Sequence, residues 1–245
     1  MKTINVPTLG ARYWTSLCLA SVFGANMGDF AAHNLHLGHA SGLPPLAALL
    51  GIILLKEWRS RSQVGTELYY WLAIVTMRTA ATNLGDLATH DFHLDYLWVI
   101  AGLALLLALN VSRDPLATGT RDAGAHDLPA TNARYWGSML IAGTLGTAAG
   151  DFAADGLGLA VASLFFSALV LALVAFGNRI PLHATIFYWV TIAFVRTAGT
   201  NVGDLLAGHE GLHLGLLVST PLTGALLYLV LQFWKPQPAM RPSLA

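Results

Sequence analysis

Polar side chains recur every three or four residues through one stretch of an otherwise apolar sequence. They are Arg78, Thr82, Asp86, His90 and His93. In a helix this spacing places them along one face, with Asn83 beside them. A carboxylate and imidazoles on one face suit a divalent transition metal such as zinc, manganese, iron, cobalt or nickel. The stretch therefore predicts a metal site, and Arg78, two helical turns away, carries a counter-charge.

The same spacing of aspartate and histidines occurs near the N-terminus, and related groups follow in the second half of the chain. Asp29, His33 and His36 repeat the spacing of the group just described. The later groups have other spacings. The candidate metal ligands are Asp29, His33, His36, Asp86, His90, His93, Asp155, His209 and His213. Because the groups differ, we expect one or two metal sites rather than four equal ones.

A tandem repeat explains why these groups recur. The pair Tyr-Trp occurs four times, and each time the pair Gly-Asp follows, with its aspartate fifteen residues after the tryptophan. The four combinations are Trp14 with Asp29, Trp71 with Asp86, Trp136 with Asp151, and Trp189 with Asp204. A strongly apolar segment comes after each one. The sequence thus predicts four units, each with a moderately apolar helix and a strongly apolar helix.

The units alternate in kind. The pattern Arg-Thr-Ala-x-Thr-Asn-x-Gly-Asp occurs at 78–86 and at 196–204, in the second and fourth units only. The corresponding residues are Arg78 and Arg196, Thr82 and Thr200, and Asn83 and Asn201. This alternation indicates that an ancestral pair of units was doubled.

Composition gives the class of protein. Charged residues make up 11% of the chain, whereas a soluble domain carries about 25%. Hydrophobic residues make up 55% and the mean hydropathy is +0.59. We expect an all-α membrane protein with eight transmembrane helices. These helices would form four parallel two-helix repeats in a pseudo-fourfold arrangement, which is also a doubled 4+4 arrangement because the units alternate. The one cysteine, Cys18, excludes an internal disulfide.

The domain boundaries follow from the repeats. The predicted segments are a first half at 1–113 with repeats 13–59 and 70–111, a linker at 114–131, and a second half at 132–245 with repeats 135–177 and 188–234. The linker is expected to lie in the cytoplasm.

Basic residues predict the orientation, because they accumulate on cytoplasmic loops. Of the thirteen lysines and arginines, eleven lie at the termini or between units. The other two, Arg78 and Arg196, lie within predicted membrane helices. Both termini should therefore be cytoplasmic. The tryptophans of the four units would then form an aromatic belt at the cytoplasmic interface. The basic residues form no patch suited to nucleic acid.

Helix geometry predicts the depth of the aspartates. Fifteen residues place each aspartate roughly 22 Å from its tryptophan, in the outer third of the bilayer. Because the units run in one direction, Asp29, Asp86, Asp151 and Asp204 should share one level and form a ring. In each unit, a small residue lies four positions before the glycine that precedes the aspartate. Such pairs of small residues would let the first helices of the four units pack together at the centre.

The repeated tryptophan and the two apolar segments per unit resemble a bacterial membrane family known as a tandem repeat of unassigned function. That family has four copies of a unit with two membrane segments and a characteristic tryptophan. The resemblance covers about residues 13 to 234. It implies a multi-pass protein of the bacterial inner membrane, and it implies no catalytic residues and no substrate.

The leading functional hypothesis is a transporter, or channel-like carrier, for a divalent transition-metal cation. External aspartates and histidines would capture the ion, the aspartate ring would hold it, and polar residues of the 78–86 and 196–204 segments would line its path. Four aspartates against two arginines leave a negative interior, so metal entry would expel protons. The partners are thus the lipid bilayer, a small inorganic cation and protons; a homo-oligomer is left open.

Two other functions stay open. One is a membrane-embedded metal- or haem-binding protein with an enzymatic or redox role at the outer face, although the absence of catalytic motifs favours a non-enzymatic protein. The other is a non-catalytic membrane sensor or scaffold. Simpler roles for the residues also stay open: solvated histidines in the hairpins, helix caps at the Gly-Asp pairs, and structural clamps at the arginines.

Overall fold

The computed structural model describes residues 7, 9–59, 63–113, 131–177, 184–208 and 211–234. These residues form eight α-helices and two short π-helical segments, with no strand among them. The elements are α1 (Ala11–Asp29), η1 (Phe30–Asn34), α2 (Gly38–Arg59), α3 (Gln63–Asp86), η2 (Leu87–Asp91), α4 (Tyr96–Ser112), α5 (Ala133–Leu157), α6 (Leu159–Phe176), α7 (Ala184–Ala207) and α8 (Leu216–Phe233). The predicted all-α fold with eight helices is confirmed. The predicted linker lies outside the described residues, apart from Thr131.

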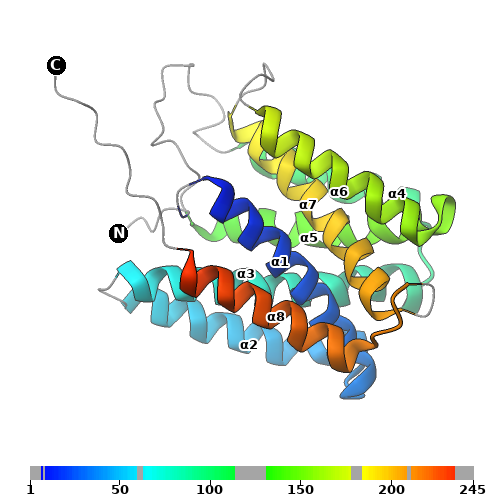
Figure 1. Cartoon of the computed structure of the whole chain (residues 1–245), viewed down its shortest axis with the longest axis horizontal. Helices are drawn as coiled ribbons and strands as arrows, with labels where there is room; N and C mark the ends of the chain where they lie inside the picture. Colours follow the sequence, from blue (N-terminus) through cyan, green and yellow to red (C-terminus); the bar gives the residue numbers. More distant parts are fainter. Residues whose placement is uncertain are drawn as a thin grey trace.

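The first helices of the four units form a closed inner ring. Each of α1, α3, α5 and α7 packs against two others, in the order α1, α3, α5, α7 and back to α1. The second helices cover this ring. Each makes its main contacts with the inner helix of the next unit: α2 with α3, α4 with α5, α6 with α7, and α8 with α1. In Figure 1, α1 begins and α8 ends at the same end of the bundle, as an even number of helices requires.

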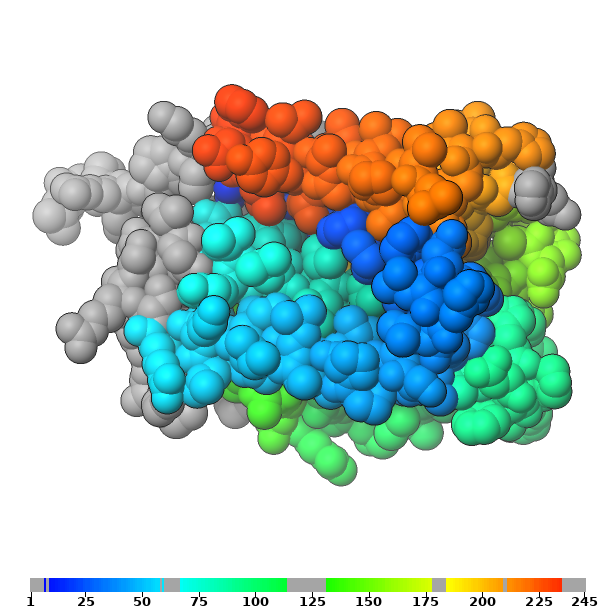
Figure 2. All heavy atoms as spheres, turned by 90° about the horizontal axis from the view of Figure 1, so that it is seen from below, coloured from blue at the N-terminus to red at the C-terminus, as the bar shows by residue number. Residues whose placement is uncertain are grey.

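The outer position of the second helices is visible on the molecular surface. On the face in Figure 2, α2 and α8 lie outermost, and atoms of α1 and α3 are seen between them. Three of the outer helices are long and apolar enough to span a membrane: Gly38–Glu57, Leu159–Phe176 and Leu216–Phe233. The fourth, α4, is apolar but shorter. These helices indicate a membrane protein. The inner helices are less apolar because they face one another and carry serine, threonine and asparagine.

Residues four apart on each inner helix form a row, and the four rows meet as successive layers. The layers are Tyr13, Tyr70, Tyr135 and Tyr188; Leu17, Ile74, Met139 and Ile192; Ser21, Arg78, Gly143 and Arg196; Ala25, Thr82, Thr147 and Thr200; and Asp29, Asp86, Asp151 and Asp204. All members of the first four layers are buried. We call the two ends of the bundle the tyrosine end and the aspartate end.

The four tyrosine hydroxyls form a closed hydrogen-bonded ring. The oxygen–oxygen distances are 3.2 Å from Tyr13 to Tyr70, 2.7 Å from Tyr70 to Tyr135, 3.0 Å from Tyr135 to Tyr188 and 2.7 Å from Tyr188 back to Tyr13. Because each hydroxyl can donate one hydrogen bond and accept another, the ring satisfies all four buried groups. It closes the bundle at the tyrosine end.

The repeat tryptophans support this ring, which corrects the prediction of an aromatic belt. Trp71 packs on Tyr13, with ring centroids 5.7 Å apart, and the same contact joins Trp136 to Tyr70 at 5.9 Å. The contact recurs for Trp189 on Tyr135 and for Trp14 on Tyr188. Trp71, Trp136 and Trp189 are buried, and Trp14 is half-buried. Each tryptophan therefore packs between two adjacent units, which explains why it recurs at the same position in all four repeats.

Glycines allow the inner helices to approach closely. A Cβ on Gly28 would lie 2.8 Å from Cβ of Thr82, and a Cβ on Gly85 would lie 2.9 Å from Cβ of Thr147. A Cβ on Gly150 would lie 2.9 Å from Cβ of Thr200. Each of these glycines therefore meets a threonine of the next unit. The glycines before Asp29, Asp86 and Asp151 thus let each of these helices approach the next inner helix closely.

Replacing Gly146 with alanine should destabilise the protein by about 1–3 kcal/mol, because the new methyl group would overpack the contact between α5 and α7. Its Cβ would meet backbone atoms of Arg196 and Thr197 at 2.7 and 2.8 Å, and backbone cannot move aside cheaply. Gly102→Ala on α4 is the matched control, since nothing lies within 4 Å of that site. Denaturant unfolding in detergent measures both. Equal stability of the two variants would contradict the close approach of α5 and α7.

The hairpins of the first two units contain a π-helical turn directly after the aspartate. In η2, Phe92 N donates to Leu87 O at 2.9 Å, and Leu35 N donates to Phe30 O at 3.1 Å in η1. The helix then ends, and His36 and His93 have positive φ angles of 55° and 53°. The predicted helical stripe therefore ends before His93, so the histidine seven residues after each aspartate lies beyond the helix.

Candidate metal site at the aspartate end of the bundle

Four aspartates gather at the end of the inner ring. Asp86 is buried, and Asp29, Asp151 and Asp204 are half-buried. The charge of Asp86 interacts with those of Asp204 and Asp151, and the charge of Asp29 interacts with those of Asp86, Asp151 and Asp204. The aspartates do not serve as N-caps of the outer helices; in the second unit, that role belongs to Asp95, which accepts from Leu97 N and Trp98 N.

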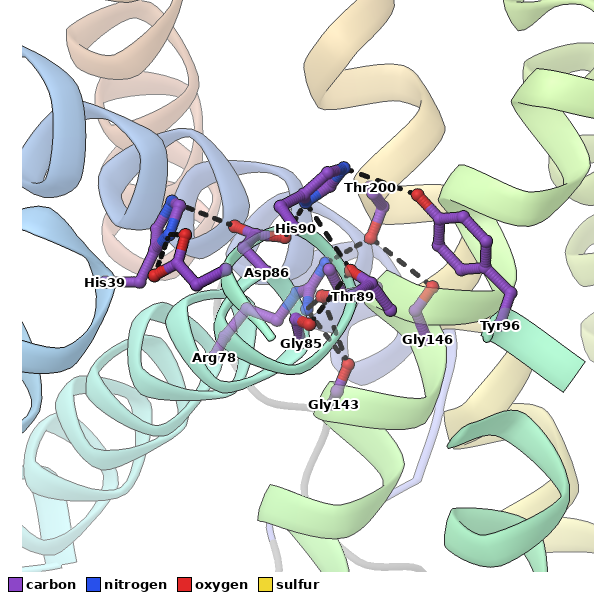
Figure 3. A network of polar contacts seen from close by, with 12 residues as sticks. His39, Arg78, Gly85, Asp86, Thr89, His90, Tyr96, Gly143, Gly146 and Thr200 are labelled. Carbon is purple, nitrogen blue, oxygen red and sulfur yellow. Dashed lines mark hydrogen bonds and ion pairs between the residues drawn. The ribbon is translucent and has the colours of Figure 1, made fainter. Parts of the chain in front are cut away.

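Three of the potential ligands at this end are close enough to share one ion. Ligand atoms of Asp86, His90 and Asp151 all lie within 4.8 Å of one another. Asp86 ends α3, His90 lies in η2, and Asp151 lies on α5. Asp86 Oδ1 is 3.8 Å from His90 Nδ1, and His90 Nε2 is 3.3 Å from the hydroxyl of Tyr96 (Figure 3). The π-helical turn places the histidine over its aspartate.

His39 approaches the same aspartate from the next layer of helices. Its Nε2 is 4.0 Å from Asp86 Oδ2, and its Nδ1 is 3.0 Å from Asp91 Oδ1. A histidine that binds a metal through one nitrogen usually donates its other N–H to a carboxylate, which fixes the orientation of the ring. His39 and Asp91 have this arrangement. The packing of α2 on α3 brings His39 here, so the neighbouring unit completes the cluster around Asp86.

Arg78 crosses the axis just below the aspartates. Its guanidinium donates to Ser21 O on α1, to Gly143 O and Thr147 Oγ1 on α5, and to Arg196 O and Thr200 Oγ1 on α7, at 2.5 to 3.4 Å (Figure 3). The side chain is 1% exposed. It also interacts electrostatically with Asp29, Asp86 and Asp151. Arg78 therefore joins all four inner helices and provides the positive charge beneath the aspartates.

Arg196 occupies the same layer but has different surroundings. It is also 1% exposed, and its Nη2 contacts Met139 Sδ at 3.7 Å. Its Nε and Nη1 have no hydrogen-bond partner among the described residues. Met139 belongs to the apolar layer, so this guanidinium points toward the tyrosine end, away from the aspartates. The two arginines of the repeated motif are therefore not equivalent.

The polar residues predicted to line a path have mostly local roles. Thr82 Oγ1 donates to Arg78 O on its own helix, whereas Thr200 Oγ1 accepts from Arg78. The side-chain amides of Asn83 and Asn201 are fully buried, and they have no hydrogen-bond partner among the residues that the structure describes. Asn83 Nδ2 lies against Gly42 of α2, and Asn201 Oδ1 lies against Gly150 of α5. Of these four residues, only Thr200 contacts a guanidinium.

The other predicted ligands lie at the exposed rim. His33 is exposed, and its ring packs edge-on against His39 with centroids 5.5 Å apart. His36, His93 and His213 are exposed and have positive φ angles at the same position in three hairpins. Asp155 is exposed on α5. His209 lies outside the described residues. None of the described side chains among these belongs to the group formed by Asp86, His90 and Asp151.

Sequence reasoning missed some members of the cluster. The sequence places Asp151 in the ring and not among the metal ligands, and the predicted ligand set does not include His39. Asp151 could have been found from the ring order, which makes α5 the neighbour of α3. His39 occupies the same position in its hairpin as Tyr96 does in the second unit, where Tyr96 contacts His90. The packing of α2 on α3 explains the contact of His39 with Asp86.

These features define an all-α protein of four two-helix repeats with a carboxylate and histidine cluster at one end of its inner ring. Residues 134–179 and 187–236 match the family described as a Repeat of Unknown Function (DUF347). The second half of the chain therefore consists of two tandem copies of this repeat, and the predicted relationship to a repeat family of unassigned function is confirmed. Comparisons with curated proteins and with solved structures gave no match.

Proposed function

We propose that the protein is a multi-pass membrane protein that binds a divalent transition-metal cation at the outer mouth of its inner ring, as the loading site of a carrier. The observation that carries the proposal is the convergence of Asp86, His90 and Asp151, with ligand atoms within 4.8 Å of one another. Two ligands at 2.0–2.2 Å from one ion lie at most about 4.4 Å apart, so small side-chain rotations suffice.

The ligand set favours a transition metal over calcium or magnesium. Calcium and magnesium prefer oxygen ligands, whereas imidazole suits zinc, iron, nickel and copper. His39 adds a second imidazole to two carboxylates and His90. Four such ligands match the four-coordinate geometry that zinc prefers. Manganese or iron could bind the same four ligands together with water.

The arrangement below the site supports a carrier more than an open pore. A cation that moves along the axis from the aspartates meets Arg78, which is held by the three other inner helices. The buried guanidinium of Arg196 and the closed tyrosine ring follow. Passage therefore requires the inner helices to separate and Arg78 to change partners, and a metal that neutralises the aspartates would weaken the interactions that hold Arg78 in place.

The distribution of charge supports the placement of the aspartate end outside a bacterial inner membrane. In the described residues, the basic side chains near the helix ends all lie at the tyrosine end: Arg12, Lys56, Arg59, Arg113 and Arg134. Positive charge marks the cytoplasmic side. With this orientation all eight helices cross the membrane and both termini are cytoplasmic.

Metal content and metal movement test the proposal together. The full-length protein, purified in detergent, is expected to retain about one transition-metal ion per chain, measured by plasma mass spectrometry. Reconstituted in liposomes that contain a metal-sensitive dye, it should admit that ion. Bound metal without movement would favour the alternative of a resident metal centre at the outer face. Metal-free protein of full stability would contradict metal binding altogether.

Replacing Asp91 with asparagine should lower the metal affinity by about 10- to 100-fold without abolishing binding. The carboxylate orients His39 and makes its other nitrogen a better ligand, and the amide provides a weaker interaction. Asp95→Glu, which keeps the acidic helix cap of α4 outside the cluster, is the control. Isothermal titration with zinc or manganese measures both variants. An unchanged affinity in Asp91→Asn would remove His39 from the site.

A further inference from the structure

The two buried arginines differ in a way that the metal site does not explain. Every nitrogen of the Arg78 guanidinium donates a hydrogen bond, and aspartates balance its charge. Arg196 is equally buried, but two of its three nitrogens have no partner in the described part of the chain. A buried charge without a counter-charge costs several kcal/mol, and more within a membrane. The site around Arg196 is therefore suited to an anion.

The surroundings of Arg196 restrict the source of that negative charge. Its charge and that of Arg78 repel each other, so Arg78 provides no compensation. Arg196 contacts Met139, in the layer between it and the four tyrosines, and each tyrosine hydroxyl can donate one hydrogen bond. The N–H donors of Arg196 and the O–H donors of the tyrosines therefore lie on the two sides of the apolar layer that contains Met139.

The tyrosine ring can supply a hydrogen-bond donor if one of its four links opens. Its links alternate between short, at 2.7 Å, and long, at 3.2 Å and 3.0 Å. The longest joins Tyr13 to Tyr70, and it is the weakest of the four. If this link opens, one hydroxyl can donate to an anion that Arg196 also contacts.

The apolar layer determines which anions fit. Leu17, Ile74, Met139 and Ile192 lie between Arg196 and the tyrosines, and each is at most 1% exposed. These side chains provide no hydrogen bonds to a multivalent oxyanion, and they favour ions that lose water easily. Met139 is unbranched and polarisable, so it can adjust to a large ion.

We propose that Arg196 and the tyrosine ring bind a small, weakly hydrated monovalent anion of the halide class. The guanidinium donates through Nε and Nη1, and a tyrosine hydroxyl donates from the opposite side. The anion neutralises the guanidinium that the aspartates do not reach. This site is independent of the metal site, from which Arg78 separates it.

Thermal stability in different salts tests the proposal. The full-length protein in detergent is compared in sodium chloride, sodium bromide and sodium gluconate at equal ionic strength. We expect the halides to raise Tm by about 5 °C or more in a saturable manner, because an anion that binds only the folded protein stabilises it. Arg196→Gln should have the same Tm in all three salts. Asp86→Asn, which changes the metal site and leaves Arg196 and the four tyrosines in place, should keep the halide dependence.

Two results would overturn the proposal: a wild-type Tm that is the same in all three salts, or halide dependence that persists in Arg196→Gln. If Arg196→Gln does not fold, crystals of the wild-type protein grown in sodium bromide give the answer. An anomalous peak within hydrogen-bonding distance of Arg196 Nε or Nη1 is expected. Bromide peaks confined to the surface would contradict the site. Loss of metal binding leaves this result unaffected, so the two proposals fail separately.

Discussion

Arg78→Met is expected to destabilise the protein by about 3–5 kcal/mol, the largest effect on stability that we predict. The variant leaves the aspartates without their nearest positive charge and leaves acceptors on α1, α5 and α7 unpaired. Methionine has a similar length, so the loss is electrostatic rather than a loss of volume. Unfolding by denaturant in detergent, at a fixed detergent concentration, measures the change.

Arg134→Met is the matched control for this prediction. Arg134 is exposed at the tyrosine end and donates to Arg113 O, so its removal should change stability by less than about 0.5 kcal/mol. Arg78→Lys adds a second comparison, because a lysine keeps the charge but cannot donate to three helices at once. Stability of Arg78→Met equal to that of the control would show that Arg78 does not hold the inner ring together.

The double variant Asp86→Asn with His90→Ala should lower metal affinity by more than about 100-fold, beyond the range expected for residues that only orient a ligand. Asp86 is the residue that both histidines approach, so its loss affects every arrangement of the site. Affinity for zinc or manganese is measured by titration of the metal-free protein.

His93→Asn controls for a general loss of histidine at the same end. It removes an exposed imidazole three residues from His90, and asparagine tolerates the positive φ angle of that position. The control should bind metal as the wild-type protein does. A double variant with wild-type affinity, or a control with the same loss as the double variant, would contradict the assignment of Asp86 and His90.

The repeat made much of the fold predictable. The constant distance from tryptophan to aspartate indicated four units, eight helices and a common level for Asp29, Asp86, Asp151 and Asp204. These predictions depend on spacing, which the sequence contains directly. The exposed character of the second helices followed from their higher apolarity. What spacing alone does not contain is the partner of each helix in the folded protein.

Contacts between units were therefore the part that sequence reasoning missed. An outer helix and its own inner helix are joined by a short hairpin, which suggests that they pack together, yet α2 packs mainly on α3 and α8 on α1. This shift by one unit brings His39 to Asp86. The contact of Trp71 with Tyr13 joins two inner helices of adjacent units, α3 and α1. Spacing along the chain specifies neither contact.

The arginines show why identical motifs differ in their environment. Arg78 and Arg196 each begin the pattern Arg-Thr-Ala-x-Thr-Asn-x-Gly-Asp, and the sequence predicted one role for both. Both lie in the same layer of the inner ring. Arg78 bonds to Thr147 and Thr200. Arg196 instead contacts Met139 of the adjacent apolar layer.

Anomalous diffraction at the absorption edge of the retained metal tests the central claim most directly. Crystals of the full-length protein loaded with zinc or manganese should show one strong peak in contact with Asp86, His90 and Asp151, with His39 turned toward it. A peak only among the exposed rim histidines, or no peak after loading, would contradict a metal site at the mouth of the inner ring.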